Sequence, residues 1–273
     1  MKVANYTTNP EHIYSAPLSR REVALLAGWE RERRVSVTLE DIREKVGANV
    51  ARDVASRLVA KKALERIERG KYLVRPLRSM SRPTAASAAV QAAASLQGEP
   101  YYLGGLWALT FHRLTEQQFV SVLDAFVARR RGSRQLAGAR LVFHRVSPER
   151  LTYGTMAAEV EGMSVRLSDP ERTLVDLLDF PALAGDSSEA LRVAKTVLPR
   201  LQHARVLEYA ARGARASTCQ RLGLLLERAG VAPRRTSALH KRALETKSVL
   251  SMVAGEPRTG HLNRRWRVIE NDR

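Results

Sequence analysis

The stretch NVARDVASRLVAKKALERIERGKYLV, residues 49–74, decides how the N-terminal part of the chain folds. In its first half, apolar residues at helical spacing predict the buried side of a helix: Val50, Val54 and Leu58. Asn49 can cap that helix. Polar and cationic residues occupy the other side: Arg52, Ser56, Arg57 and Lys61. The pattern therefore predicts a helix with a cationic surface facing solvent.

The second half of the stretch predicts a β-hairpin. Residues 64–67 and 71–74 are short apolar-rich runs, and the turn between them contains Gly70, which readily takes a positive φ. This hairpin carries three more cations: Arg66, Arg69 and Lys71.

Two further helices are predicted upstream, at 18–31 and from Thr38 to Gly47, where Asp41 completes a weak capping box. The order of helix, helix, cationic helix and hairpin is that of a winged helix-turn-helix, in which the last helix lies in the DNA major groove. We therefore predict DNA contacts from Asn49, Arg52, Ser56, Arg57, Lys61, Arg66, Arg69 and Lys71.

The charge of the whole chain favours an acidic partner. The 273 residues carry 46 Lys and Arg against 28 Asp and Glu, a net charge of +18, which favours nucleic acid as the partner. The winged helix-turn-helix pattern makes double-stranded DNA the expected nucleic acid. A GC-rich genome would explain the preference for Arg over Lys, but not the excess of cations. No apolar run of about 18 residues is present, and the N-terminus lacks an apolar signal segment. We expect a soluble, cytoplasmic protein without membrane contact.

The chain is predicted to contain two domains. Residues 76–83, PLRSMSRP, have the composition of a linker. We assign a winged helix-turn-helix domain to 1–77, a linker to 78–83 and a larger C-terminal domain to 84–273. The predicted fold class is α+β, with a mixed α/β C-terminal domain that ends in a helical tail.

Within the C-terminal domain, strands are predicted at 101–103, 119–126, 139–146 and 159–167, the last with a turn at Glu161-Gly162. Helices are predicted at 106–114, from Ser168 as the cap, and through 186–246. The segments SVLSMV and NRRWRVIE are expected to close the sheet. The loop ARRRGSRQLAG is predicted as a second basic surface with two open uses, a DNA contact or a docking surface for an acidic partner or RNA. Its residues are Arg129, Arg130, Arg131 and Arg134. The alternative is a solvated loop that has no partner.

Four segments, taken in order, resemble the AbiEi-like antitoxins of type IV toxin–antitoxin systems, which belong to bacterial abortive-infection modules. They are the winged N-terminus, YYLGGLWALTFHRLTEQ, FHRVSPERL and VRLSDPERTLVDLLDFP. The resemblance covers residues 18–180 well and the tail from 186 less well. It implies that the winged helix represses its own promoter by binding repeated DNA sequences. It also implies that the C-terminal domain counters a nucleotidyltransferase toxin encoded beside it.

We predict that the chain is not an enzyme and needs no cofactor or metal. Gly132-Ser133 lacks the nearby carboxylates that a nucleotidyltransferase uses to hold magnesium. Glu159 and Glu161 are interpreted as exposed strand residues, the histidines lack zinc spacing, and the single cysteine, Cys219, is interpreted as buried. Two non-enzymatic alternatives remain open beside the antitoxin. One is a winged-helix regulator without antitoxin activity, and the other is a basic module that binds RNA or protein.

Overall fold

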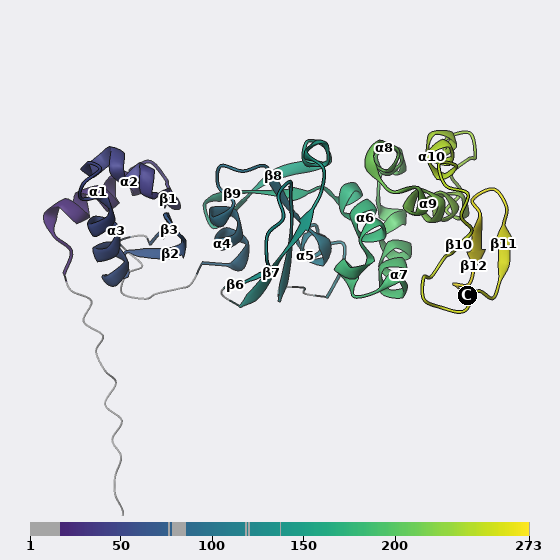
Figure 1. The fold of residues 1–273 in the computed structure, drawn as a ribbon, viewed down its shortest axis with the longest axis horizontal. Helices are drawn as coiled ribbons and strands as arrows, with labels where there is room; N and C mark the ends of the chain where they lie inside the picture. Colours follow the sequence, from purple (N-terminus) through teal and green to yellow (C-terminus); the bar gives the residue numbers. More distant parts are fainter. Residues whose placement is uncertain are drawn as a thin grey trace, which may run out of the picture. The chain divides into compact units, whose positions relative to one another are not determined.

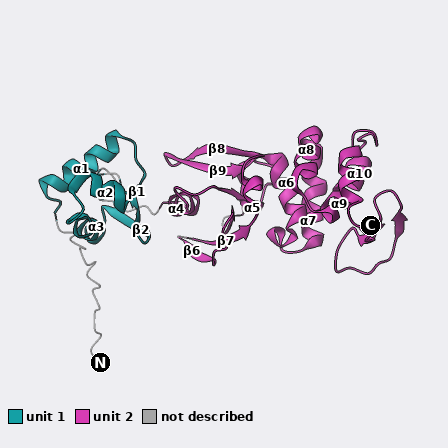
Figure 2. Ribbon diagram, turned by 45° about the horizontal axis from the view of Figure 1, so that its top comes forward, with its two compact units in different colours: residues 1–85 teal, residues 86–273 magenta. Residues whose placement is uncertain are grey.

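The computed structural model describes residues 17–75, 77, 86–117, 119, 121–136 and 138–272. Contacts divide the chain into two compact units, unit 1 (Met1–Ala85) and unit 2 (Ala86–Arg273), shown in teal and magenta in Figure 2. The linker predicted at 78–83 lies outside the described residues. Both units contain α-helices and β-strands, which agrees with the predicted α+β fold class (Figure 1).

In its described residues, unit 1 contains three α-helices and a three-stranded antiparallel sheet in the strand order β1-β3-β2. The elements are α1 (Arg20–Arg31), β1 (Ser36–Thr38), α2 (Leu39–Val46), α3 (Ala51–Ala60), β2 (Leu64–Glu68) and β3 (Lys71–Val74). The predicted hairpin is confirmed, and Gly70 in its turn has a φ of 75°. The turn is also attached to α2, because the Leu39 N–H donates to the Gly70 carbonyl at 2.7 Å.

Capping boxes define where the first two helices of unit 1 begin. Thr38 accepts from the Asp41 N–H and the Asp41 carboxylate accepts from the Thr38 N–H, which confirms the predicted capping box. Ser19 and Glu22 form an equivalent box at the start of α1. Gly47 ends α2 with a φ of 91°, a conformation that glycine adopts without strain.

Unit 2 is built on a six-stranded mixed sheet in the order β6-β7-β5-β4-β9-β8. Its strands are β4 (Tyr101–Gly104), β5 (Val122–Val127), β6 (Arg134–Leu136), β7 (Ala139–Arg145), β8 (Thr155–Val160) and β9 (Met163–Ser168). The pairs β4–β9 and β5–β7 are parallel, and the other neighbours are antiparallel. The predicted turn at Glu161-Gly162 is confirmed, and it separates β8 from β9.

Helices cover both faces of this sheet, as Figure 1 shows. On one face the alanine-rich α4 (Ala88–Ser95) packs its small side chains against β-strand residues such as Leu103. On the other face, Tyr102 and Phe126 share a core with Leu109 of the next helix, α5 (Gly105–Phe111). Adjacent residues of β4 thus point into opposite cores, as the period of a strand requires.

The rest of unit 2 is mainly helical, as predicted for 186–246. The helices are α5 (Gly105–Phe111), α6 (Pro170–Asp179), α7 (Ser187–Val197), α8 (His203–Gly213), α9 (Ala216–Arg228) and α10 (Ser237–Ala243). Short 3-10 turns lie at Pro148–Leu151, Pro181–Ala184 and Leu198–Arg200. None of the helices formed by the described residues is both long and apolar enough to cross a membrane.

Three expectations for unit 2 are wrong. SVLSMV and NRRWRVIE do not join the large sheet. They form β10 (Leu250–Ser251) and β12 (Val268–Glu270) of a separate sheet, in which β12 pairs with both β10 and β11 (His261–Asn263). The segment 128–138 is not loop throughout, because Arg134 begins strand β6. Ser168 does not cap α6; it ends β9, and Asp169 caps the helix by accepting from the Arg172 N–H.

Candidate nucleic-acid interface

Helix α3 has a buried side and an exposed cationic side. Ala51, Val54, Ala55 and Leu58 are buried in the core of unit 1. Arg52, Ser56 and Arg57 are exposed, as predicted. Arg52 has no ionic or hydrogen-bonding partner within the described part of the chain, so its guanidinium is available to an external anion.

The predicted start of α3 is wrong by one residue. The residue before the helix is Val50, which is 46% exposed and therefore does not belong to the buried side. Asn49 is exposed in the α2–α3 turn, and no side chain caps the first turn of α3. The first N–H groups of this helix are therefore left without a side-chain cap.

Lys61 is not part of the exposed cationic side. Its ammonium donates to Glu22 of α1 at 2.7 Å, and only 16% of its side chain is exposed. Arg57 approaches the same carboxylate, with its Nε 3.6 Å from Glu22 Oε1, but 55% of its side chain remains in solvent. Lys61 therefore connects α3 to α1, and Arg57 remains accessible.

The carboxylate of Glu22 is held in its charged form. Burial by itself raises the pKa of Glu22, but the hydrogen bonds from Lys61 and Ser19 outweigh burial and lower the pKa to about 2. The same side chain completes the capping box of α1. Glu22 thus fixes both the start of α1 and the position of α3 against it.

The three cations of the hairpin differ in their exposure to solvent. Arg66 and Arg69 are exposed and have no ionic partner among the residues that the structure describes. Lys71 is half-buried and lies opposite Thr38 of β1, since β3 pairs with both neighbours. Glu65, an acidic residue of the hairpin, forms an ion pair with Arg75 at 3.3 Å. Its negative charge is therefore balanced within the hairpin.

The predicted second basic surface divides into two parts. Arg129 and Arg130 are exposed, as predicted. Arg131 forms an ion pair with Glu99, and both Arg131 and Arg134 lie over the ring of Phe143, at 5.7 and 5.5 Å. These two guanidiniums are thus held against the sheet instead of lying in a solvated loop.

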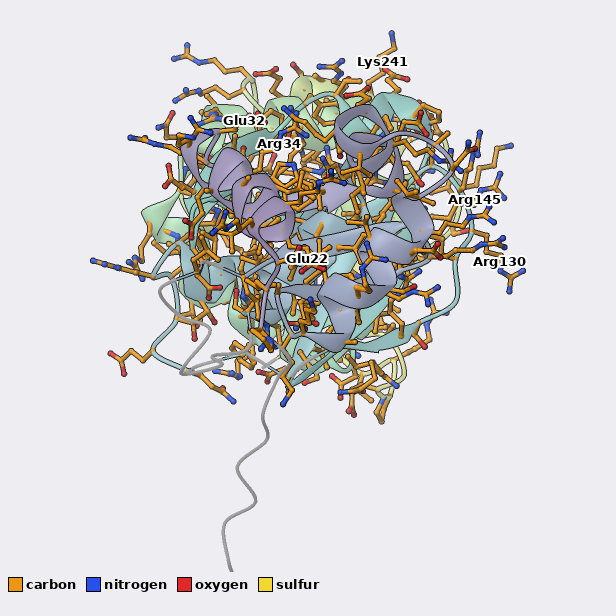
Figure 3. All side chains as sticks on the ribbon, turned by 90° about the vertical axis from the view of Figure 1, so that its left-hand side faces the viewer. Glu22, Glu32, Arg34, Arg130, Arg145 and Lys241 are labelled. Carbon is orange, nitrogen blue, oxygen red and sulfur yellow. The ribbon has the colours of Figure 1, made fainter. Side chains whose placement is uncertain are left out.

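The structure adds Arg145 to this surface, which no motif in the sequence singled out. Val127, the last residue of β5, pairs with Arg145 at the end of β7, so the loop that starts at residue 128 runs beside it. Figure 3 shows Arg130 and Arg145 both reaching outward from the ribbon. Only the parallel pairing of β5 with β7 brings these residues together.

Unit 2 also contains a buried network of charged side chains centred on α6. Arg172 is fully buried, and its Nε donates to both carboxylate oxygens of Asp176 at 3.0 Å. Its other nitrogens donate to the Tyr102 hydroxyl at 2.8 Å and the Tyr153 carbonyl at 3.2 Å. The Tyr102 hydroxyl in turn donates to Asp176. This cluster ties α6 to the strand β4.

Further ion pairs extend the network toward the other helices. Arg150 donates to Asp179 at 2.6 Å and to Asp176 at 2.9 Å. Asp179 also accepts from the Thr218 hydroxyl of α9 at 2.7 Å, and Asp169 accepts from Arg205 of α8 at 2.6 Å. The motif SDPERTLVDLLD thus positions the helical part of unit 2 on the sheet.

Burial and neighbouring charges perturb the pKa values of several groups in this core, among them Arg172 and Tyr102. Desolvation lowers the pKa of Arg172, while Asp176 and the two tyrosines raise it by more, so this guanidinium stays charged. Desolvation raises the pKa of Tyr102, which keeps its hydroxyl neutral and able to donate. The carboxylates of this cluster are paired with arginines, so we regard the network as scaffold and not as a reactive site.

The remaining candidate residues are accounted for by packing. Cys219 is fully buried, as predicted, and burial raises its pKa to about 12. His112 follows α5 directly, and its Nε2 lies 2.7 Å from the Ser168 carbonyl. Glu159 and Glu161 are exposed, as predicted. Within the residues described, no group of three His, Cys, Asp or Glu side chains is arranged to hold a metal ion.

Comparison with known proteins finds a similar fold but no family. No protein-family model matches the chain, and no curated protein does so. The crystal structure of the RV2827C protein from Mycobacterium tuberculosis superposes with a TM-score of 0.60, covering 93% of this chain and 92% of that one, at 17% sequence identity. The similarity between these two chains is one of fold alone.

Proposed function

We propose that this chain is the DNA-binding antitoxin and transcriptional autorepressor of a type IV toxin–antitoxin module. In this proposal, unit 1 is a winged helix-turn-helix that binds promoter DNA at repeated sites. Unit 2 counters a nucleotidyltransferase-like toxin encoded by a neighbouring gene, and no step is enzymatic.

One observation carries the DNA-binding half: α3 follows α2 after a short turn and exposes Arg52, Ser56 and Arg57 beside a hairpin that exposes Arg66 and Arg69. A helix of this kind placed in the major groove would bring the arginines toward base edges and phosphates. The hairpin would reach the adjacent backbone as a wing. Lys61 is withdrawn from this proposal as a contact, because Glu22 already holds it.

The net charge supplies the driving force for binding. With a net charge of +18, the chain attracts DNA at long range, and each phosphate that it neutralises releases counterions. Asp53 lies among the exposed cations of α3, in its first turn, where it stabilises the helix dipole. Affinity would therefore come from the arginines of α3 and of the wing together.

The antitoxin half rests on the four sequence segments that resemble AbiEi-like antitoxins. Three of them lie in unit 2 and form β4–α5, the end of β7 with the turn after it, and β9–α6. Of these residues, many belong to the buried network, so they account for the fold of unit 2 and not for its contact with a toxin. The exposed group Arg129, Arg130 and Arg145 is the surface that we assign to an acidic partner or to RNA.

The DNA-binding half is tested by measuring anisotropy of labelled DNA from upstream of the chain's own gene across a salt series. The double variant Arg52→Ala/Arg57→Ala should bind more weakly and lower the slope of log K against log salt by about two units, roughly 0.9 for each lost phosphate contact. Arg192→Ala is the matched control, since this arginine is exposed and lies in unit 2. An unchanged slope in a folded double variant contradicts the assignment.

The antitoxin half needs a separate assay in cells that express the neighbouring toxin gene. The full-length Arg52→Ala/Arg57→Ala variant should still rescue growth while a promoter reporter is derepressed. Loss of rescue together with repression would mean that the chain acts on the toxin only through transcription. Repression without any rescue by the wild-type chain would leave a winged-helix regulator as the better description.

A further inference from the structure

Unit 1 contains a groove beside α3 whose lining includes one proposed DNA contact, Arg57, at its edge. It has a volume of about 930 Å³ and runs between α1 on one side and the end of α2 with the start of α3 on the other. Apolar and small residues form its floor: Leu25, Gly28, Trp29, Val46, Val50 and Val54. The groove lies wholly within unit 1, so its shape does not depend on where unit 2 sits.

One residue of the floor is not explained by the fold. Gly28 lies inside α1, where glycine is less favourable than alanine, yet a Cβ at this position would meet nothing within 4 Å. An incoming chain that approaches the backbone at Gly28 would explain this glycine.

The rim of the groove is cationic. Its two carboxylates are already paired, Glu22 with Lys61 and Glu32 with Lys45 at 2.9 Å. Arg21 and Arg31 are exposed on α1 and have no carboxylate partner among the described residues. The groove thus combines an apolar floor with uncompensated positive charge on its edge.

We propose that this groove binds an amphipathic helix of a partner protein, with apolar residues on one face and acidic residues beside them. Apolar side chains at positions i, i+4 and i+7 of such a helix would pack on the apolar floor of the groove, as in other helix-in-groove complexes. Its carboxylates would face Arg21 and Arg31. The inference goes beyond the proposed function and does not depend on it.

Charge argues for a different protein as the occupant and against a second copy. Residues 1–80 of the chain carry 17 cations and 10 anions, so two copies of unit 1 would repel each other. The first 16 residues contain one lysine and one glutamate, and they cannot supply the acidic face that the rim requires. An acidic amphipathic helix of another protein complements both the apolar floor and the cationic rim of the groove.

The test uses the full chain and a fluorescein-labelled helical peptide with leucine at heptad a and d positions and glutamate elsewhere. A twin peptide carries lysine in place of glutamate. We expect the acidic peptide to bind at least about tenfold more tightly than the twin at low salt, since the charges of rim and peptide are complementary. Equal binding of both peptides, or none, overturns the proposal.

Two variants locate the binding site. Gly28→Leu should fill the floor and abolish binding, whereas Val23→Leu, an exposed position on the same helix outside the groove, should leave it unchanged. Arg21→Glu/Arg31→Glu should reverse the preference toward the lysine peptide. Its control is Arg20→Glu/Arg33→Glu, which makes the same change of charge at exposed residues off the groove. If Gly28→Leu lowers the melting temperature, the charge reversal alone decides.

Other occupants would show themselves in the same experiment. If the peptide binds only after residues 1–16 are removed, the chain's own N-terminus fills the groove and the proposal is wrong. If the wild-type chain is a dimer that Gly28→Leu dissociates, the occupant is a second copy, and the proposal is again wrong. Binding by the intact monomer that Gly28→Leu abolishes supports it.

Discussion

Arg172 is the residue whose replacement should most affect unit 2. The change Arg172→Met keeps much of the apolar volume of the side chain and removes the guanidinium. It eliminates the paired bonds to Asp176 and the bonds to the Tyr102 hydroxyl and the Tyr153 carbonyl. Asp176, itself fully buried, keeps Arg150 at 2.9 Å and Tyr102 at 2.8 Å as its remaining donors.

The expected loss of stability is large compared with that of most single substitutions. Removing one partner of a buried ion pair costs about 3–5 kcal/mol, because the other charge is left in a medium that solvates it poorly. A domain is stable by only about 5–15 kcal/mol. Arg150 and Tyr102 still solvate Asp176, so we expect the lower end of that range, about 3 kcal/mol.

Urea denaturation of the full chain, followed by hydrogen exchange and mass spectrometry, would measure this loss separately in each unit. Peptides of α6, α8 and α9 should lose protection, whereas peptides of α1 to α3 should not. The control is Arg192→Met, whose side chain is 63% exposed and pairs with Glu189 within one helix. It should change stability by less than about 0.5 kcal/mol.

A second variant separates the cost of the unpaired charge from the value of the pair. Arg172→Met/Asp176→Leu removes both charges, and it should be more stable than Arg172→Met alone if the isolated carboxylate causes most of the loss. A loss of less than about 1 kcal/mol in Arg172→Met would refute the reasoning, since it would mean that Asp176 does not need this guanidinium.

Three further outcomes are expected. The free energy of unfolding of unit 1 should fall as the pH drops from 4.5 toward 2, because the pKa of Glu22 is lowered to about 2 in the folded chain. Burial by itself raises this pKa, and the hydrogen bond from Lys61 lowers it. Lys61→Met should reduce that pH dependence, and an identical urea midpoint profile in the variant would contradict the assignment. Cys219, with its pKa raised to about 12, should resist a thiol reagent in the native chain and react after denaturation; rapid native labelling would show that it is accessible. Gly223→Ala should lower the melting temperature, because the new methyl would collide with the ring of Trp266, at a cost of about 1–3 kcal/mol; an unchanged melting temperature would mean that the ring moves aside freely.

Local sequence determined most of unit 1. The capping box at Thr38 and Asp41, the end of α2 at Gly47 and the hairpin turn at Gly70 depend on residues within a few positions of one another. Such interactions form in any context where the segment folds, so the periodicity of the side chains was enough to predict them. The same holds for α6, in which three leucines recur at helical spacing and are all buried: Leu174, Leu177 and Leu178.

Part of the candidate site could have been found in the sequence and was not. Lys61 lies three residues after Leu58 and seven after Val54, so helical spacing places it toward the buried side of α3. Its partner Glu22 is 39 positions away, and nothing local points to it. The cation at that position forms an internal ion pair only because α1 packs against α3.

Only the tertiary structure decided which charges face solvent and which are scaffold. Arg130 and Arg131 are neighbours in the chain, yet the first is exposed and the second is held by Glu99 and Phe143. In the sequence, Arg172 and Asp176 resemble any surface ion pair at i and i+4. In the fold, β4 places Tyr102 against them and the pair is buried. Charge and spacing are properties of the sequence, but desolvation and long-range pairing arise only when distant segments pack together, and these determine what each charge does.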